Sequence, residues 1–361
     1  MNFIRINTII TLLYRFFSLS FCLFFIISLK AQTQFEFYSE AYSSLKSRSK
    51  YEPFPSFLTS YQSQNVNDVN LMLLKINHEQ PLSKELPIIW GFNSGLMFGT
   101  YADQNLVAEN ARFQNFYELN AYVKWNDKFK FEYGILPSHI GFESPIGKES
   151  WAATRSILAD NSPYYEYGYR LSYTSKSGNI KANLNAVKGW QNISNPIPGR
   201  YAIGHQITVS EKDEFTINSS SYFGVSPSDP KNQRFFHNFY AQFYFGDRIA
   251  WILGFDNGIE IYPNGTREQY HTPVGIVKYA ISKNIGVTGR YEYFNDAHLI
   301  FNMADLYNVH GYSVNADFTI NKQWLLRVEN RWFVITNNTK GVETDYRSPF
   351  YPKLILCAQI K

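Results

Sequence analysis

The histidines are the first residues of this chain to consider for chemistry. Seven are scattered along the sequence: His78, His139, His205, His237, His271, His298 and His310. Their separations fit no metal-ligand motif. Ser138–His139 offers a hydroxyl beside a base, but adjacent residues of an extended segment face opposite sides. We therefore expect no catalytic group, metal or cofactor, and we expect His139 to make hydrogen bonds within a packed loop.

Charged residues form a second group, because they recur on the polar face of alternating segments. Near the middle of such segments stand Glu132, Arg170, Arg290, Glu292, Arg327 and Glu329, and the set extends towards the segment ends with Glu166, Asp317 and Arg331. Both signs of charge are present, so these side chains can pair or can line a hydrated passage. If they only neutralised one another, they would plug that passage.

The segments that carry these residues read as β-strands. Tyr117, Leu119 and Ala121 alternate with polar residues, Asn126–Asp127 makes a tight turn, and alternation resumes at Phe129. This hairpin pattern recurs, and predicts strands near 33–44, 66–77, 86–101, 113–125, 128–137, 164–175, 179–190, 201–211, 214–225, 235–245, 248–256, 273–282, 285–294, 309–320, 323–336 and 351–361.

The connections alternate between two lengths. Tight turns are expected near 126, 177, 212, 246, 283 and 321. Long polar loops are expected at 45–65, 102–112, 138–163, 191–200, 226–234, 257–272, 295–308 and 337–350. This alternation is typical of outer-membrane barrels, with short periplasmic turns and long extracellular loops. We predict an all-β fold: one transmembrane antiparallel up-and-down barrel of about 16 strands. Aromatic stripes filling a soluble β-core are the alternative, but they leave the loop lengths unexplained.

One loop, 138–163, is far longer than a hairpin connection requires. Lys148 to Asp160 is expected to form a short helix inside it. If the loop folds inward, it would narrow the lumen and present charges of both signs; these candidate residues are Glu143, Lys148, Glu149, Arg155 and Asp160. An external cap is the alternative placement.

The N-terminus resembles a secretory signal. Arg5 and Arg15 precede an apolar run of about fourteen residues, which is short for a spanning helix. We expect cleavage after Ala31, leaving a barrel over 32–361; a retained N-terminal anchor is the alternative. Cleavage would remove three basic residues and no acid, so the formal net charge of +4 would become +1. A nearly neutral mature chain excludes nucleic acid as an evident partner.

A resemblance to a known family lies in the segment PSHIGFESPIGKESWAATRSILADNSPYYE, with GWQNI and FFHNFY further on. These residues resemble the OmpL-like β-barrel porin family, most strongly over 117–245. The resemblance implies an outer-membrane barrel that acts as a porin, with no catalytic residue or cofactor to carry over.

Together these observations predict a porin in the outer membrane of a Gram-negative bacterium. Small polar solutes would diffuse passively through a lumen constricted by the 138–163 loop. Its other expected partners are outer-membrane lipid and the barrel-assembly machinery; the sequence leaves oligomer formation open. The first alternative is a non-conducting structural or adhesive barrel that binds an external partner through its long loops. The second, a barrel enzyme acting on lipid, has the weakest support.

Overall fold

The computed structural model describes residues 33–44, 67–105, 113–194, 200–296, 307–339, 342–348 and 351–361. The predicted signal peptide, residues 1–31, lies outside these ranges. The strands are β1 (Thr33–Ser44), β2 (Asn67–Pro81), β3 (Ile88–Phe98), β4 (Phe116–Trp125), β5 (Phe129–Pro137), β6 (Tyr165–Thr174), β7 (Ile180–Val187), β8 (Ala202–Glu211), β9 (Phe215–Val225), β10 (Gln233–Phe245), β11 (Ile249–Ile261), β12 (Arg267–Ala280), β13 (Ile285–Asp296), β14 (Tyr307–Thr319), β15 (Trp324–Thr339), β16 (Val342–Arg347) and β17 (Lys353–Ile360). Three short helices join them: α2 (Thr100–Asn105), η1 (Gly147–Glu149) and α3 (Ile157–Asp160).

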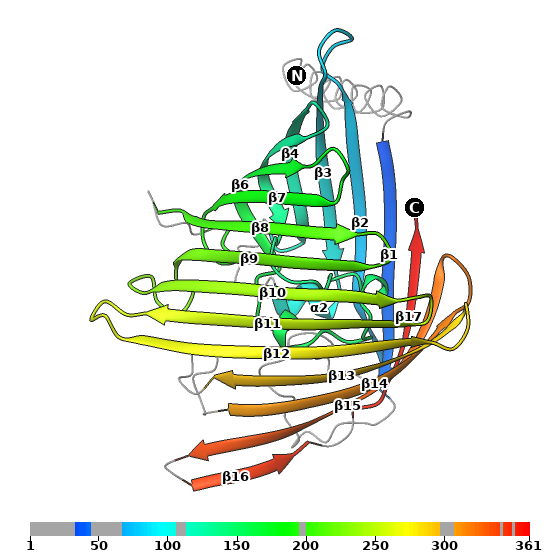
Figure 1. The fold of residues 1–361 in the computed structure, drawn as a ribbon, viewed down its shortest axis with the longest axis vertical. Helices are drawn as coiled ribbons and strands as arrows, with labels where there is room; N and C mark the ends of the chain where they lie inside the picture. Colours follow the sequence, from blue (N-terminus) through cyan, green and yellow to red (C-terminus); the bar gives the residue numbers. More distant parts are fainter. Residues whose placement is uncertain are drawn as a thin grey trace, which may run out of the picture.

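The strands close into an antiparallel ring. Each strand from β1 to β15 pairs with the next, and β17 pairs with both β15 and β1, where Cys357 lies opposite Glu40. Of the 17 strands in this sheet, β16 pairs with β15 alone in the described part of the chain, so sixteen strands form the ring. In Figure 1 the blue β1 and the red β17 lie side by side, far from each other in sequence. The prediction of a barrel of about sixteen strands is confirmed.

The prediction of a long loop was wrong at two places. At 257–272, β11 continues to Ile261 and β12 begins at Arg267, so the connection is a tight turn closed by Tyr262 and Thr266. At 337–350, β15 continues to Thr339 and β16 pairs back on it. In both places backbone pairing continues along the strands beyond the ends that were expected from the sequence.

The tight turns have the backbone geometry that hairpins require. Asn126 and Asp127, between β4 and β5, have φ angles of 55° and 52°. Two successive residues with positive φ match the right-handed twist of the flanking strands, and Asn and Asp tolerate this region well. The predicted turn near 126 is confirmed.

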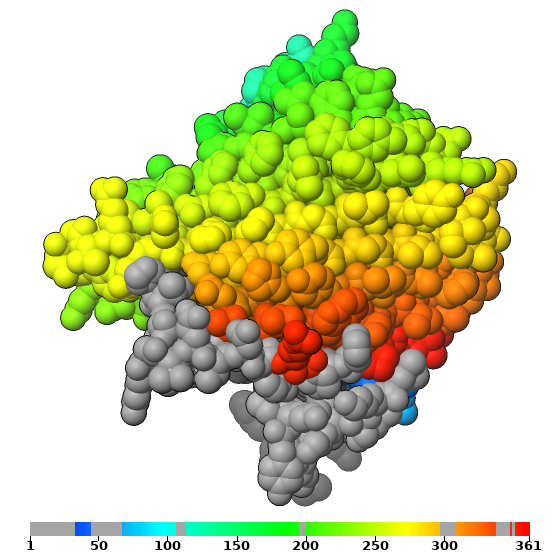
Figure 2. All heavy atoms as spheres, turned by 60° about the horizontal axis from the view of Figure 1, so that its bottom comes forward, coloured from blue at the N-terminus to red at the C-terminus, as the bar shows by residue number. Residues whose placement is uncertain are grey.

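Side chains alternate between an outer apolar face and an inner face. On β11 the outward Trp251, Leu253 and Phe255 are 45%, 54% and 40% exposed, whereas the inward Ile252 and Asp256 are 4% and 1% exposed. Figure 2 shows the outer surface as successive colour bands, because each strand lies beside its sequence neighbour. Such a surface suits contact with hydrocarbon. Among the described residues, no helix has the length and hydrophobicity that a membrane crossing requires.

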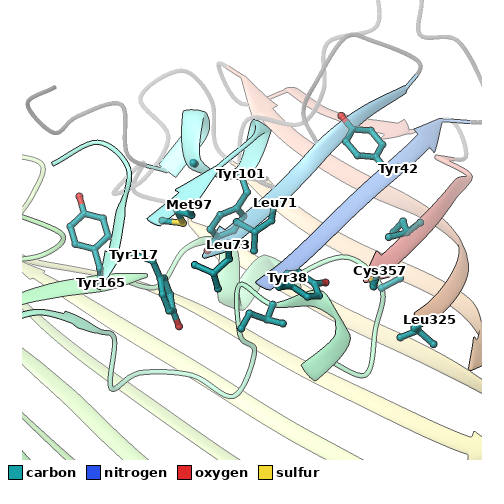
Figure 3. Packing of buried hydrophobic residues seen from close by; sticks show 14 of the residues in the cluster. Tyr38, Tyr42, Leu71, Leu73, Met97, Tyr101, Tyr117, Tyr165, Leu325 and Cys357 are labelled. Carbon is teal, nitrogen blue, oxygen red and sulfur yellow. The ribbon is translucent and has the colours of Figure 1, made fainter. Parts of the chain in front are cut away.

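The inside of the barrel is filled near β1 by a cluster of buried side chains. Tyr38 and Leu73 of the wall, Tyr101 of α2 and Ile146 of the 138–163 segment belong to it. Figure 3 shows Tyr38, Leu73 and Tyr101 close together beside the strands of this wall. Tyr165 of β6 also belongs to the cluster and is 1% exposed. Its hydroxyl donates to the carbonyl of Gln191 at 3.1 Å.

Candidate functional site

The 138–163 segment lies inside the barrel. Its backbone contacts inward-facing side chains of β1, β10, β13 and β15, and α3 packs against β11, β12 and β13. An external cap could not make these contacts, because the partners face the lumen. At its deepest point, Lys148 Nζ donates to the carbonyl of Lys322 at 2.6 Å, in the short turn between β14 and β15. The segment therefore reaches from the long-loop end of the barrel to the short-turn end.

The local structure of this segment differs from the expected helix over 148–160. It contains two single turns, η1 and α3, with an irregular stretch between them. Ser156 caps α3 by accepting a hydrogen bond from the Ala159 amide at 3.1 Å. The intervening backbone is instead bonded to the wall, which outweighs the weak intrinsic stability of a short helix.

Two strands of the wall hold that intervening backbone. Arg290 of β13 donates to the carbonyl of Thr154 at 2.6 Å, and Arg331 of β15 donates to the carbonyl of Arg155 at 2.9 Å. In the opposite sense, Glu329 accepts from the Thr154 amide at 2.8 Å and Glu292 accepts from the Ile157 amide at 2.6 Å. Guanidinium groups thus bind the carbonyls, and carboxylates bind the amides.

These four charged side chains also neutralise one another. Arg331 Nη2 lies 2.6 Å from Glu292 Oε1, and Arg290 Nη2 lies 3.3 Å from Glu329 Oε1. None of the four is more than 5% exposed. Buried charges are tolerated only when paired and hydrogen-bonded, and this network meets both conditions.

Arg327 makes a second attachment lower in the barrel. Its guanidinium donates to the carbonyls of Gly147 and Trp151, both at 2.7 Å, and to Asp317 at 2.8 Å. On the other side of η1, the Tyr38 hydroxyl accepts from the Lys148 amide at 3.2 Å. The segment is therefore clamped between β15 and β1.

Apolar contacts complete the attachment. Ile157 packs with Phe294, Val309 and Phe333, and Leu158 packs with Ile252 and Val274. These wall residues lie on the inner face, where polar residues were expected. Full burial of an aliphatic side chain contributes about 1.5–3 kcal/mol, so Ile157 and Leu158 add materially to the attachment.

The entry to the segment is held at β5, β6 and β9. His139 Nδ1 lies 2.7 Å from Glu166 Oε1, and its Nε2 lies 2.8 Å from the carbonyl of Ser221. The expectation that His139 is a hydrogen-bonding loop residue is confirmed. Arg170 donates to Asn185 and to the carbonyl of Pro137, at 2.8 and 2.7 Å, and Glu132 pairs with Lys130 at 2.5 Å.

The five residues predicted for the narrow part of the loop have different environments. Arg155 is 1% exposed and donates to the carbonyl of Pro145, and Asp160 accepts from the Tyr164 hydroxyl at 2.9 Å. Glu143 accepts from the Ser156 amide at 2.9 Å. Lys148 is bound to the turn at 322–323, and Glu149 is exposed. Of these five residues, Glu149 is exposed and Lys148 is half-buried, and the other three carry buried charges.

Sequence reasoning missed the backbone partners of the charged residues. Thr154, Gly147 and Trp151 supply carbonyls to the wall, and no side-chain pattern signals a carbonyl acceptor. A usable signal did exist on the inner faces, where Ile252, Val274 and Phe294 interrupt the polar pattern. Apolar residues facing a hydrated lumen indicate that something covers them.

The closed sixteen-strand ring, the apolar outer face and the segment folded into the lumen define an outer-membrane β-barrel of porin architecture. Residues 36–350 match the family described as "Putative beta-barrel porin-2, OmpL-like", and the chain belongs to this family. No curated protein sequence matches the chain.

Several solved outer-membrane proteins share the fold. An anion-selective porin from Comamonas acidovorans is 10% identical, with a TM-score of 0.58, over 91% of this chain and 100% of that one. The outer membrane channel DcaP of Acinetobacter baumannii is 13% identical, with a TM-score of 0.55, over 92% and 98%. OmpT of Vibrio cholerae, in a trimer form, is 9% identical, with a TM-score of 0.58, over 91% and 99%. At these identities the likeness concerns the fold, and with the family it points to the bacterial outer membrane.

Proposed function

We propose that this protein is a porin-like channel through which small polar solutes diffuse passively, with the 138–163 segment constricting the lumen. The observation that carries the proposal is the attachment of Thr154, Arg155 and Ile157 to Arg290, Glu292, Glu329 and Arg331 from within the ring. A segment bound this firmly to β13 and β15 occupies a fixed part of the lumen's cross-section.

The inner wall away from these strands supports a hydrated passage. Lys75, Lys124 and Lys130 keep 18%, 32% and 27% of their side chains exposed. Each pairs with a nearby carboxylate, so the wall carries balanced charge. A passage lined in this way would favour polar solutes and would select weakly between ions.

Planar-bilayer recording of the purified mature protein tests the proposal. Discrete conductance steps are expected, and silence across buffers and voltages would reject a channel. Graded polyethylene glycols added to the same bath would then measure the narrowest diameter.

A second candidate, a non-conducting structural or adhesive barrel, is favoured by the full burial of Arg290, Glu292 and Glu329, which shows charged side chains used to anchor a segment in the interior. Sugar uptake into proteoliposomes separates the two candidates, because a plugged barrel would be no faster than empty vesicles. In either case we expect no enzymatic activity.

The proposal also includes a signal peptide over 1–31, a Gram-negative host and passage through the barrel-assembly machinery. It further includes an oligomer, which the trimer form of OmpT supports.

A further inference from the structure

The outer surface of the barrel carries a groove at the long-loop end of β8 to β11. Its volume is about 660 Å³, and Arg200, Tyr201, Ile203, Phe223, Lys231 and Ile261 are among the residues that line it. The groove is separate from the lumen, because Ile203 and Phe223 are 60% and 40% exposed outward while their neighbours Ala202 and Tyr222 are 2% and 1% exposed.

The height of the groove places it at the outer edge of the membrane. Ile203 and Phe223 pair with each other near the long-loop ends of β8 and β9, at the far end of the strands from the short turn after Glu211. About nine to eleven residues of a tilted strand cross the hydrocarbon layer, so these residues lie near its outer boundary.

Basic side chains surround the upper part of the groove. Arg200 donates to the carbonyl of Pro230 at 3.2 Å, which holds its guanidinium beside the Lys231 position. Lys188 Nζ lies 2.7 Å from the Tyr201 hydroxyl, and Arg267 pairs with Ile261 across β11 and β12. Two carboxylates are near: Asp229 accepts from the Lys231 amide at 2.8 Å, and Glu268 accepts from the Tyr262 hydroxyl at 2.6 Å. Two cations, Arg200 and Lys231, therefore line the groove, and Lys188 and Arg267 lie next to its lining residues, against two acids.

We propose that this groove binds a phosphate-bearing lipid of the outer leaflet. Guanidinium and ammonium groups are the preferred protein partners of phosphate oxygens, and a basic cluster at a membrane surface recognises anionic headgroups. The apolar floor of Ile203, Phe223 and Ile261 below the cations accepts the first part of the acyl chains. A soluble anion would contact only the cations, whereas a lipid contacts both the cations and this floor.

The apolar floor of the groove extends only a short way down the strands, and this length indicates which part of the lipid the groove recognises. One pair below Ile203 and Phe223, His205 lies opposite Ser221, and His205 Nδ1 is 2.6 Å from the Ser221 hydroxyl. Because a polar pair follows the apolar one, acyl contact in the groove is limited. The headgroup phosphate, and not chain length, is therefore expected to decide binding.

Native mass spectrometry of the mature barrel in non-ionic detergent tests this inference. The probes are lipid A, a glucosamine lipid with two phosphates, and phosphatidylcholine, whose headgroup has no net charge. The double variant Arg200→Gln/Lys231→Gln is compared with Lys176→Gln/Lys212→Gln, which removes two exposed lysines at the short-turn end. A heat-dependent shift in gel mobility verifies that each variant is folded. If a double variant does not fold, the two single variants are tested in its place.

The wild-type and control barrels are expected to retain lipid A, and the groove variant to bind it about tenfold more weakly, since two solvent-exposed ion pairs with the phosphates are lost. Equal retention by the groove variant, or equal retention of phosphatidylcholine by the wild type, would overturn the inference. So would displacement of lipid A by millimolar inorganic phosphate, which would show an anion site and not a lipid site. None of these readouts depends on whether the lumen conducts.

Discussion

Glu292 Oε2 accepts a hydrogen bond at 2.6 Å from the backbone N–H of Ile157, a residue 135 positions away in the sequence. The other carboxylate oxygen lies 2.6 Å from Arg331 Nη2. One carboxylate therefore joins the segment inside the barrel to the charge network of the wall. The position of the 138–163 segment therefore depends on the charge network of Arg290, Glu292, Glu329 and Arg331.

Replacing Glu292 by Gln should detach the middle of the segment. The substitution removes the carboxylate charge that lies 2.6 Å from Arg331 and 3.4 Å from Arg290 Nε, so the buried Arg331 loses this partner while Arg290 keeps Glu329. Breaking one partner of such a pair costs about 3–5 kcal/mol. Limited proteolysis should cut the variant within 147–160 at denaturant concentrations that leave the wild type intact. Glu211→Gln, at an exposed short turn, serves as the control and should resist like the wild type.

Gly147→Ala should loosen the lower attachment. A Cβ atom at Gly147 would overlap Glu40 Oε2, and this carboxylate is held in place because its other oxygen, Oε1, accepts a hydrogen bond from Asn70 at 2.8 Å. The added methyl group must therefore push η1 away from β1. The matched control is Gly289→Ala, since a Cβ atom there would meet nothing within 4 Å.

The rate at which the Cys357 thiol is labelled distinguishes Gly147→Ala from its control, Gly289→Ala. Cys357 is buried on the inner face of β17, in the same apolar cluster as Ile146 and Ala153 of the segment, and Cys22 would leave with the signal peptide. A water-soluble maleimide should label Gly147→Ala several times faster than the wild type and Gly289→Ala. Identical labelling of all three would show that the segment does not shield β17.

Glu149→Lys and Arg155→Glu should have different consequences, although both were predicted from the sequence as residues of the narrow part. Glu149 is exposed, and a charge about 8 Å from a passing ion in water contributes about 0.5 kcal/mol before screening. Reversal changes the energies of an anion and of a cation in opposite directions, each by twice this amount, so after screening the ratio of anion to cation permeability should rise about fourfold. Arg155 is buried, so its reversal should detach the segment. Reversal potentials in a salt gradient distinguish these outcomes, and an unchanged ratio in folded Glu149→Lys would place this residue away from the ion path.

The strands could be predicted from the sequence because alternation with period two is a local signal. The attachment of the segment could not, because Glu292 and Ile157 meet only after the ring has closed. For the same reason the helix expected over 148–160 was wrong: wall contacts at Thr154 and Trp151 replace the hydrogen bonds of a continuous helix. β16 was missed because it is only six residues long, VETDYR, and lies in a stretch that was expected to be a long loop; its pairing with β15 identifies it.

We propose that the 138–163 segment narrows a conducting lumen. The measurement that tests this proposal best is the single-channel conductance of the wild-type barrel and of a variant lacking Lys148 to Asp160. The sixteen-strand ring does not need these residues for its backbone hydrogen bonds, so the variant should fold and show the heat-shifted gel mobility of the wild type. We expect larger conductance steps and passage of larger polyethylene glycols in the deletion variant. A folded deletion variant whose conductance and size limit equal those of the wild type would contradict the proposal.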